Sequence, residues 1–154
     1  MLLLIFQSGK DRYGLDVSLV TEVVPFAALK QVPHAPEGMI GLLNYRGIIV
    51  PVIDLSAILS GVPSRAWLST RIILVNVSGD VARPRILGFV AERVTETFQC
   101  REEDLQTSGV AVSRAPYLGK IMLNQHEMIQ HIDPTAVLPE SLKESLFAIA
   151  ECRV

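Results

Sequence analysis

Hydrophobic positions in this chain fall into short runs that are separated by glycine, proline and small polar residues. A run over residues 38–45 and a β-branched run over residues 48–53 stand on either side of Arg46 and Gly47. This arrangement predicts two strands joined by a tight turn, because glycine tolerates positive φ and β-branched residues favour strands. Arg46 is the only charged residue of the segment, and at a turn apex its side chain projects from the sheet. It is either a contact residue or a solvated turn arginine.

Further runs along the chain predict further strands. Residues 2–6 and 12–17 flank a turn and predict a hairpin, and residues 20–24 alternate until a proline ends the strand. Residues 71–77 and 85–94 predict a second hairpin, which we expect to begin a second group of strands. The remaining segments with strand character are residues 96–100, 120–124 and 127–132.

Helical signals are short and few. Residues 56–60, followed by Gly61, have the pattern of a short helix with a glycine cap, and Asp133 with the proline after it starts a helical turn. Residues 141–144 have the spacing of a capping box, which predicts a C-terminal helix. Many short strands with few helices predict a mainly β, barrel-like fold.

Composition limits the classes of partner. The 154 residues are the size of one domain, and a hydrophobic content of 49% supports a sizeable core. A net charge of −2 gives no bulk field that would hold nucleic acid or an anionic membrane. No run approaches the roughly 20 apolar residues of a membrane span. Cys100 and Cys152 make no disulfide framework and the apolar N-terminus lacks a basic region, so we expect a cytoplasmic protein without direct membrane insertion.

Catalytic and cofactor signals are weak. The three histidines lack the spacing of a metal site, and no glycine-rich phosphate loop or nucleophile elbow is present, so we expect neither cofactor nor metal. Glu22 and Asp54 could serve as a carboxylate pair for acid–base chemistry, but either could equally pair with Arg46. An enzyme that uses Glu22 or Asp54 is therefore the least favoured interpretation.

A sequence motif links the central hairpin to a known family. The pattern G-x-x-N-x-R-G-x-x-x-P-V-x-D-L resembles the signature of the CheW family of bacterial chemosensory scaffold proteins. Upstream, residues 13–15 (YGL) and residues 20–23 (VTEV) resemble two further segments of that family. The motif is matched by Gly41, Asn44, Arg46, Gly47, Pro51, Val52, Asp54 and Leu55.

The resemblance implies a fold and a function. It implies one domain over residues 1–154, made of two packed SH3-like five-stranded β-barrel subdomains with a boundary near residues 65–70, and a C-terminal segment that packs back on the first barrel. It also implies a noncatalytic adaptor. Such an adaptor couples the cytoplasmic tip of a methyl-accepting chemoreceptor to the regulatory domain of a CheA-type histidine kinase, at membrane receptor arrays.

The resemblance also carries over to single residues. Arg46 and Glu22 match family positions at the receptor-facing groove, and we expect them to form a charge pair that holds the turn. The other expected receptor contacts are Val20, Val23, Val24 and Tyr45. The positions expected to serve the structure of the motif are Gly41, Asn44, Gly47, Pro51 and Asp54.

Two departures from the family pattern suggest a divergent member. Tyr45 stands where leucine is usual, and Ala91 with Glu92 stands where the family commonly has valine and aspartate. A divergent member could serve an accessory pathway, such as a Wsp-type surface-sensing pathway. The alternative to the adaptor is a small β-barrel interaction module with an unrelated partner.

Overall fold

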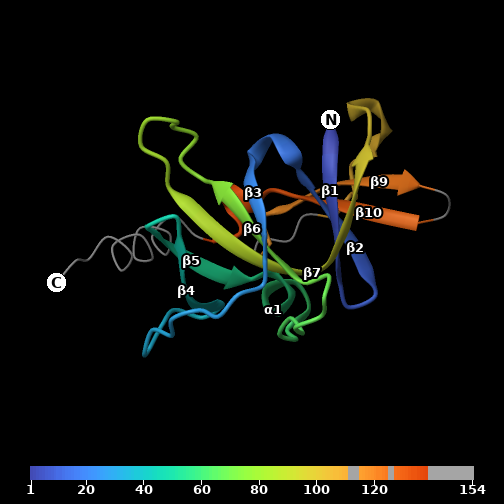
Figure 1. Ribbon diagram of the computed structural model, residues 1–154. Coiled ribbons are helices and arrows are strands. Elements are labelled where there is room, and N and C mark those ends of the chain that lie inside the picture. Colours follow the sequence, from blue (N-terminus) through green and yellow to red (C-terminus); the bar gives the residue numbers. More distant parts are fainter. Residues whose placement is uncertain (111–114, 125–126, 139–154) are drawn as a thin grey trace.

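The computed structural model describes residues 1–110, 115–124 and 127–138 (Figure 1). Strands dominate this part of the chain, so the prediction of a mainly β fold is confirmed. The strands are β1 (Leu2–Ser8), β2 (Asp11–Asp16), β3 (Val20–Pro25), β4 (Met39–Tyr45), β5 (Ile48–Asp54), β6 (Arg71–Asn76), β7 (Ile86–Gln99), β8 (Leu105–Gln106), β9 (Leu118–Asn124) and β10 (Glu127–Ile132).

The strands form two packed halves that share β7. One half has the order β4–β5–β7–β6–β3, and the other has the order β7–β1–β2–β10–β9, with the short β8 beside β9. Residues 86–91 of β7 pair with β6, and residues 92–99 pair with β1. Figure 1 shows β7 as a long, curved strand that runs from one half into the other. This arrangement is consistent with the predicted pair of SH3-like barrels.

The second hairpin is correctly predicted as β6 and β7, but it does not begin a second group of strands. β6 pairs with β3, and β7 pairs in parallel with β5, so both complete the half that the central hairpin starts. The sequence missed this pairing because strand periodicity shows which face is buried and not which strand lies alongside. The subdomain boundary near residues 65–70 stays a prediction.

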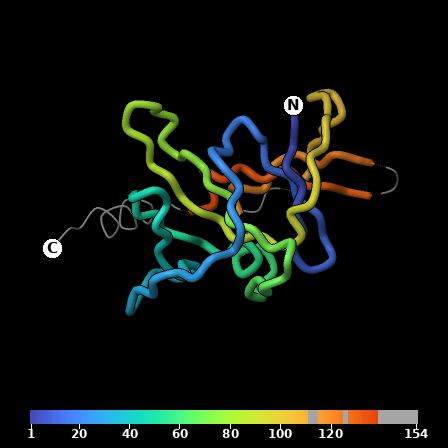
Figure 2. Tube along the Cα trace, in the orientation of Figure 1, coloured from blue at the N-terminus to red at the C-terminus, as the bar shows by residue number. Residues whose placement is uncertain are grey.

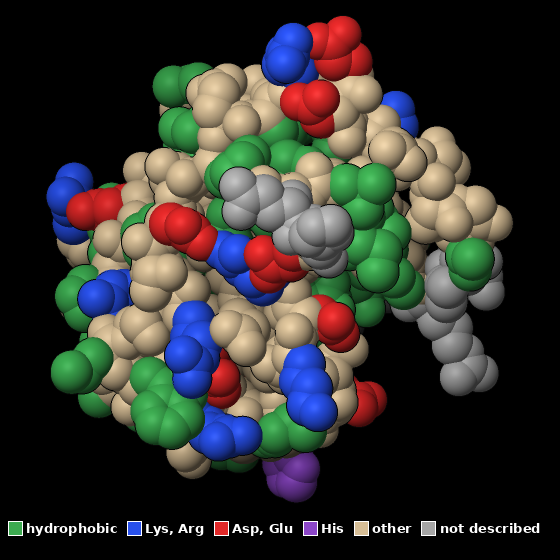
Figure 3. Space-filling view, turned by 90° about the vertical axis from the view of Figure 1, so that its right-hand side faces the viewer, with side chains coloured by type: hydrophobic (Ala, Val, Ile, Leu, Met, Phe, Trp, Pro, Cys, Tyr) green, Lys and Arg blue, Asp and Glu red, His purple; other side chains and the backbone are tan. Residues whose placement is uncertain are grey.

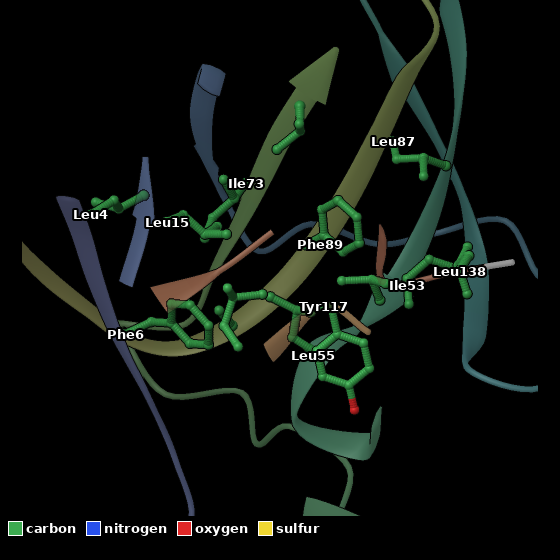
Figure 4. Packing of buried hydrophobic residues seen from close by; sticks show 14 of the residues in the cluster. Leu4, Phe6, Leu15, Ile53, Leu55, Ile73, Leu87, Phe89, Tyr117 and Leu138 are labelled. Atoms are coloured by element: carbon green, nitrogen blue, oxygen red, sulfur yellow. The ribbon is translucent and has the colours of Figure 1, made fainter. Parts of the chain in front are cut away.

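Three hydrophobic clusters fill the molecule. One lies inside the first half, around Val52, Ile72 and Leu74, and a second lies inside the other half, around Leu3 and Met122. The third, which we call the central cluster, draws its side chains from both halves (Figure 4). Its labelled members are Leu4, Phe6, Leu15, Ile53, Leu55, Ile73, Leu87, Phe89, Tyr117 and Leu138.

Burial on both faces explains the apolar runs in β1, β6 and β7. In β6, Ile72 and Leu74 face the interior of the first half, whereas Ile73 and Val75 face the central cluster. Successive side chains of a strand point to opposite faces, so a strand between two cores must be apolar at every position. In β7, Gly88 allows close packing, because a Cβ there would lie 3.0 Å from Ile72 Cγ2.

The short helices lie where the sequence predicts them. α1 (Leu55–Ser60) ends at Gly61, whose φ of 77° is the left-handed conformation of a glycine cap. The helical turns η1 (Val17–Leu19), η2 (Glu102–Asp104) and η3 (Pro134–Ala136) are single turns. The predicted C-terminal helix lies outside the described residues, so its packing on the first barrel stays a prediction. The chain before it ends in the central cluster with Val137 and Leu138.

The central cluster predicts where stability is concentrated. Leu87→Ala should lower the free energy of unfolding by about 2–5 kcal/mol, because Leu87 is fully buried and its loss leaves a cavity between the halves. Urea denaturation measures this change.

Leu68→Ala is the matched control, because the same atoms are removed from a side chain that is 96% exposed. It should change the free energy of unfolding by less than about 0.5 kcal/mol. Equal effects of the two substitutions would contradict the assignment of β7 to the shared core.

Candidate functional site

The signature turn, residues 44–47, joins β4 to β5. Arg46 and Gly47 occupy the two turn positions with φ of 51° and 85°. Two successive positive φ values are typical of the type I′ turn, which matches the twist of a hairpin. Asn44 Oδ1 accepts a hydrogen bond of 2.9 Å from the Gly47 amide and so closes the turn. The turn thus explains the asparagine and the glycine of the N-x-R-G pattern. The arginine is not explained in this way, because a non-glycine residue in the left-handed region is conformationally unfavourable.

The turn packs against β3 through Glu22. The Tyr45 hydroxyl donates a hydrogen bond to Glu22 Oε2, and Arg46 Nη2 lies 3.4 Å from Glu22 Oε1. The Arg46 guanidinium also lies over the Tyr45 ring, with Cζ 5.2 Å from the ring centroid. The predicted pair of Glu22 and Arg46 is thus present in the structure. Sequence reasoning missed that Tyr45 holds the same carboxylate, because a strand residue gives no signal of which neighbour its hydroxyl will meet.

The ion pair of Glu22 and Arg46 contributes little to stability at neutral pH. Arg46 is 74% exposed and Glu22 34% exposed at the side chain, so their ion pair contributes at most about 1 kcal/mol. The hydrogen bond to Glu22 raises the pKa of the Tyr45 hydroxyl above its ordinary value near 10. The phenol therefore stays protonated, and its donated bond is lost only as pH rises through this raised pKa. The geometry of the turn is kept at neutral pH, and the guanidinium stays accessible.

The valines of β3 divide between the surface and the interior. Val23 is 36% exposed, whereas Val24 packs against the interior of its half and Val20 packs against the central cluster. Val20 and Val24 are partly buried, so all three valines keep some exposed surface, and their expected contact with a receptor stays a prediction. Two exposed residues that the sequence analysis missed, Ile48 and Ile49, follow the turn and are 47% and 45% exposed. β5 meets β7 only from Val52 onward, which leaves its beginning uncovered.

Gly41 and Pro51 fit the neighbouring backbone. A Cβ at position 41 would lie 2.8 Å from Leu29 Cβ and from the Lys30 carbonyl oxygen, closer than side chains tolerate. That contact exists because Leu42 exchanges two backbone hydrogen bonds with Lys30. The N–H and C=O of Leu42 consequently point away from its partner in β5, Pro51. A proline is compatible with this position, since no ladder bond to β4 needs its missing N–H.

Asp54 organises the start of α1 and the loop after it. Oδ1 accepts hydrogen bonds from the Ser56 amide at 3.0 Å and the Ser64 hydroxyl at 2.6 Å, and Oδ2 accepts one from the Ser64 amide at 2.8 Å. The carboxylate is the N-cap of α1 and is 3% exposed. Asp54 and Glu22 therefore have separate sets of partners and do not form the carboxylate pair of the enzyme hypothesis. Among the described residues no group of His, Cys, Asp and Glu is arranged to hold a metal ion.

Comparison with known proteins identifies the family. A family model for the CheW-like domain matches residues 2–141 of the chain. The chain belongs to the CheW family. Chemotaxis proteins CheW from Rhizobium meliloti and from Bacillus subtilis are each 22% identical to it over 145 residues, which cover 93% of this chain and 90% of theirs.

A solved CheW structure has the same fold. The crystal structure of the scaffolding protein TtCheW from Thermoanaerobacter tengcongensis matches with a TM-score of 0.78 and 26% sequence identity. The match covers 90% of this chain and 87% of that one. Within the described part of the chain, no helix is long and apolar enough to cross a membrane.

The contacts of Asp54 predict a large loss of stability on substitution. Asp54→Ala should lower the free energy of unfolding by about 2–4 kcal/mol, since it removes a helix cap and leaves buried amides of α1 and the following loop without an acceptor. Urea denaturation checks this value.

Asp80→Ala serves as the control, because Asp80 is an exposed loop aspartate that caps only the Ala82 amide. We expect it to cost less than about 1 kcal/mol. An Asp54→Ala protein as stable as the control variant would show that other groups satisfy these amides.

Proposed function

We propose that this CheW-family chain is a noncatalytic adaptor that couples a methyl-accepting chemoreceptor to a CheA-type histidine kinase. The contact of Glu22, Tyr45 and Arg46 at the signature turn is the observation that carries the proposal. The adaptor works in the cytoplasm and joins membrane receptor arrays through its partners. Its departures from the family pattern at Tyr45 and Glu92 favour an accessory pathway, for which a Wsp-type pathway is our specific proposal.

Arg46 is suited to bind a partner carboxylate. Its guanidinium has one weak, largely exposed ion pair, so exchanging Glu22 for a better placed carboxylate costs little. The hydrogen bond from Gly47 to Asn44 and the ring of Tyr45 hold the turn and orient the side chain before binding. Orientation before binding lowers the entropy lost in the complex. These contacts support Arg46 as the anchor of the receptor interface.

The apolar part of the proposed receptor interface adjoins this anchor. Ile48 and Ile49 follow the turn in β5, and Val23 follows Glu22 in β3 with its side chain on the opposite face of the strand. Exposed aliphatic side chains therefore lie close in sequence to both members of the ion pair. A receptor helix presents apolar and charged side chains in one stripe, which such a mixed surface fits. Val20 and Val24, which are partly buried in β3, are the remaining aliphatic contacts of the proposed interface.

The proposed kinase contact uses exposed strand or loop surface elsewhere on the barrels. The proposal needs no catalytic group, because an adaptor acts through binding free energy alone. The two other hypotheses are an interaction module with an unrelated partner and an enzyme that uses Glu22 or Asp54. The module would leave receptor and kinase binding insensitive to Arg46→Glu. The enzyme would need a concave pocket that holds a carboxylate of clearly perturbed pKa.

Affinity capture of the tagged protein from its native cells tests the proposal. The wild-type protein should recover a histidine kinase and a chemoreceptor, identified by mass spectrometry. Arg46→Glu should lose the receptor and keep the kinase, because the substitution places a second carboxylate beside Glu22. Arg46→Gly should also lose the receptor, while glycine keeps the positive φ of the turn.

Arg83→Glu is the matched control, since it makes the same change of charge on an exposed loop between β6 and β7. It should recover both partners. Absence of both partners from the wild-type capture, under conditions that preserve complexes, would count against the adaptor function. Receptor binding that survives in both Arg46 variants would remove the signature turn from the interface.

A double-mutant cycle tests whether Glu22 orients Arg46 in the complex. Receptor affinity is measured for Glu22→Ala, Arg46→Ala and the double variant. We expect a coupling energy of about 0.5–1 kcal/mol between the two positions, as for an orienting surface pair. A coupling near zero would show that Arg46 reaches the receptor without help from Glu22.

A further inference from the structure

A second concave surface lies apart from the signature turn. It has a volume of about 200 Å³ and is formed by the β1–β2 turn, α1, the loop after α1 and the middle of β7. Figure 2 shows the blue β1–β2 turn beside the green segment that follows α1. Among the described residues, its lining includes Ser60, Arg65, Trp67, Glu92 and Arg93. None of them belongs to the signature turn.

The loop that carries Arg65 and Trp67 is fixed at several points. The amide of Ser64 is held by buried Asp54 at 2.8 Å, and the amide of Arg65 is held by Glu92 Oε1 at 2.5 Å. Thr70 is 1% exposed, and its hydroxyl donates to the Arg65 carbonyl at 2.5 Å. These bonds fix the backbone that carries Arg65 and Trp67 before anything binds.

Two arginines, Arg65 and Arg93, line the pocket. Arg12, Arg46 and Arg101 each pair with a carboxylate within 4 Å. In the described part of the chain the guanidinium groups of Arg65 and Arg93 have no such pair, although Glu92 also lines the pocket. The Arg65 guanidinium lies over the Trp67 ring, 5.7 Å from its centroid. Two guanidinium groups are therefore available to bind carboxylate oxygens.

Arg93 is held in an unusual backbone conformation. Its φ is 51°, at the point where β7 leaves the sheet of β6 and joins β1. A non-glycine residue in this region costs free energy, and such strain is found where a side chain serves binding. The register of β1 against β7 shifts at this point, between the pairs Ile5–Glu96 and Gln7–Glu92, and Arg93 lines the pocket.

The rim of the pocket is apolar as well as basic. Trp67 and Val62, which line it, are 45% and 55% exposed, and Leu68 beside Trp67 is 96% exposed. Figure 3 shows the side of the molecule that lies on the right in Figure 1, and in its lower half Lys and Arg side chains lie next to a large hydrophobic side chain. A free phosphate ion would gain nothing from this apolar rim. A peptide that carries an apolar side chain beside a carboxylate would use both parts of the surface.

We propose that this pocket binds an acidic segment of a protein partner, in which carboxylate side chains alternate with apolar ones. The carboxylates bind Arg65 and Arg93, and the apolar side chains pack on Trp67 and Val62. The pocket is separate from the receptor anchor, so this interaction does not depend on the adaptor function. It gives the chain a second recognition surface for a partner.

The fluorescence of Trp67 tests the proposal directly, because the chain has one tryptophan and it lines this pocket. The probe is a capped peptide of alternating glutamate and leucine, titrated at low salt. The spectrum should shift saturably with this peptide, and it should not shift with the glutamine–leucine peptide or with inorganic phosphate. Isothermal titration of the same peptides provides a second measurement.

Two arginine variants locate the binding. Arg65→Ala and Arg93→Gly should each weaken the peptide affinity by about tenfold, the loss expected for one charged hydrogen bond. Glycine accepts the positive φ at position 93, so that variant should fold normally. Arg83→Ala removes an exposed arginine that does not line the pocket and should leave the affinity unchanged.

Three results would overturn the proposal. The first is no saturable signal with the glutamate peptide in either measurement. The second is saturation by phosphate at the same concentration as by the peptide, which would make this a site for small anions. The third is peptide binding that is unchanged in both arginine variants.

Discussion

Burial of both faces of β1, β6 and β7 is the constraint on which the rest of the structure depends. Residues 3–6 of β1, 72–75 of β6 and 86–91 of β7 lie between the interiors of the two halves and the central cluster, so each of these positions must be apolar or very small. Gly88 satisfies the second condition, because Ile72 and Val52 leave little room for a Cβ. Because β7 pairs with strands of both halves, the two barrels cannot separate without breaking one continuous strand. Relative motion of the halves is restricted as a consequence.

The signature motif combines positions that shape the backbone with Arg46, the position that we propose faces a partner. Gly41 and Pro51 accommodate the hydrogen bonds between Leu42 and Lys30, and Asp54 caps α1 and ties down the loop after it. The Arg46 side chain does not support the backbone in this way, since it is exposed and makes one weak ion pair. The conformational cost of a non-glycine residue in the left-handed region is consistent with the proposed role of Arg46 in binding.

Much of the fold followed from the sequence, because the strands are short, apolar and separated by turn residues. The hairpin at Arg46 and the cap at Gly61 are local, and turn chemistry predicted them. The pair of Glu22 and Arg46 joins distant segments, and it followed from the family resemblance. The pairing of β6 with β3 did not follow, because periodicity does not identify a neighbour. The pocket around Trp67 was missed for the same reason. Its residues come from three distant segments, and only the tertiary structure brings them together.

Both exposed arginines with positive φ, Arg46 and Arg93, lie at places where the β-structure changes direction. Arg46 lies in the hairpin turn, and Arg93 lies where β7 passes between the halves. A change of direction needs an unusual backbone conformation, and the shared core supplies the free energy that keeps it. Since the two places share no supporting hydrogen bonds, a substitution at one should leave the geometry of the other intact. The two proposed recognition surfaces can therefore diverge separately while the same core maintains the fold.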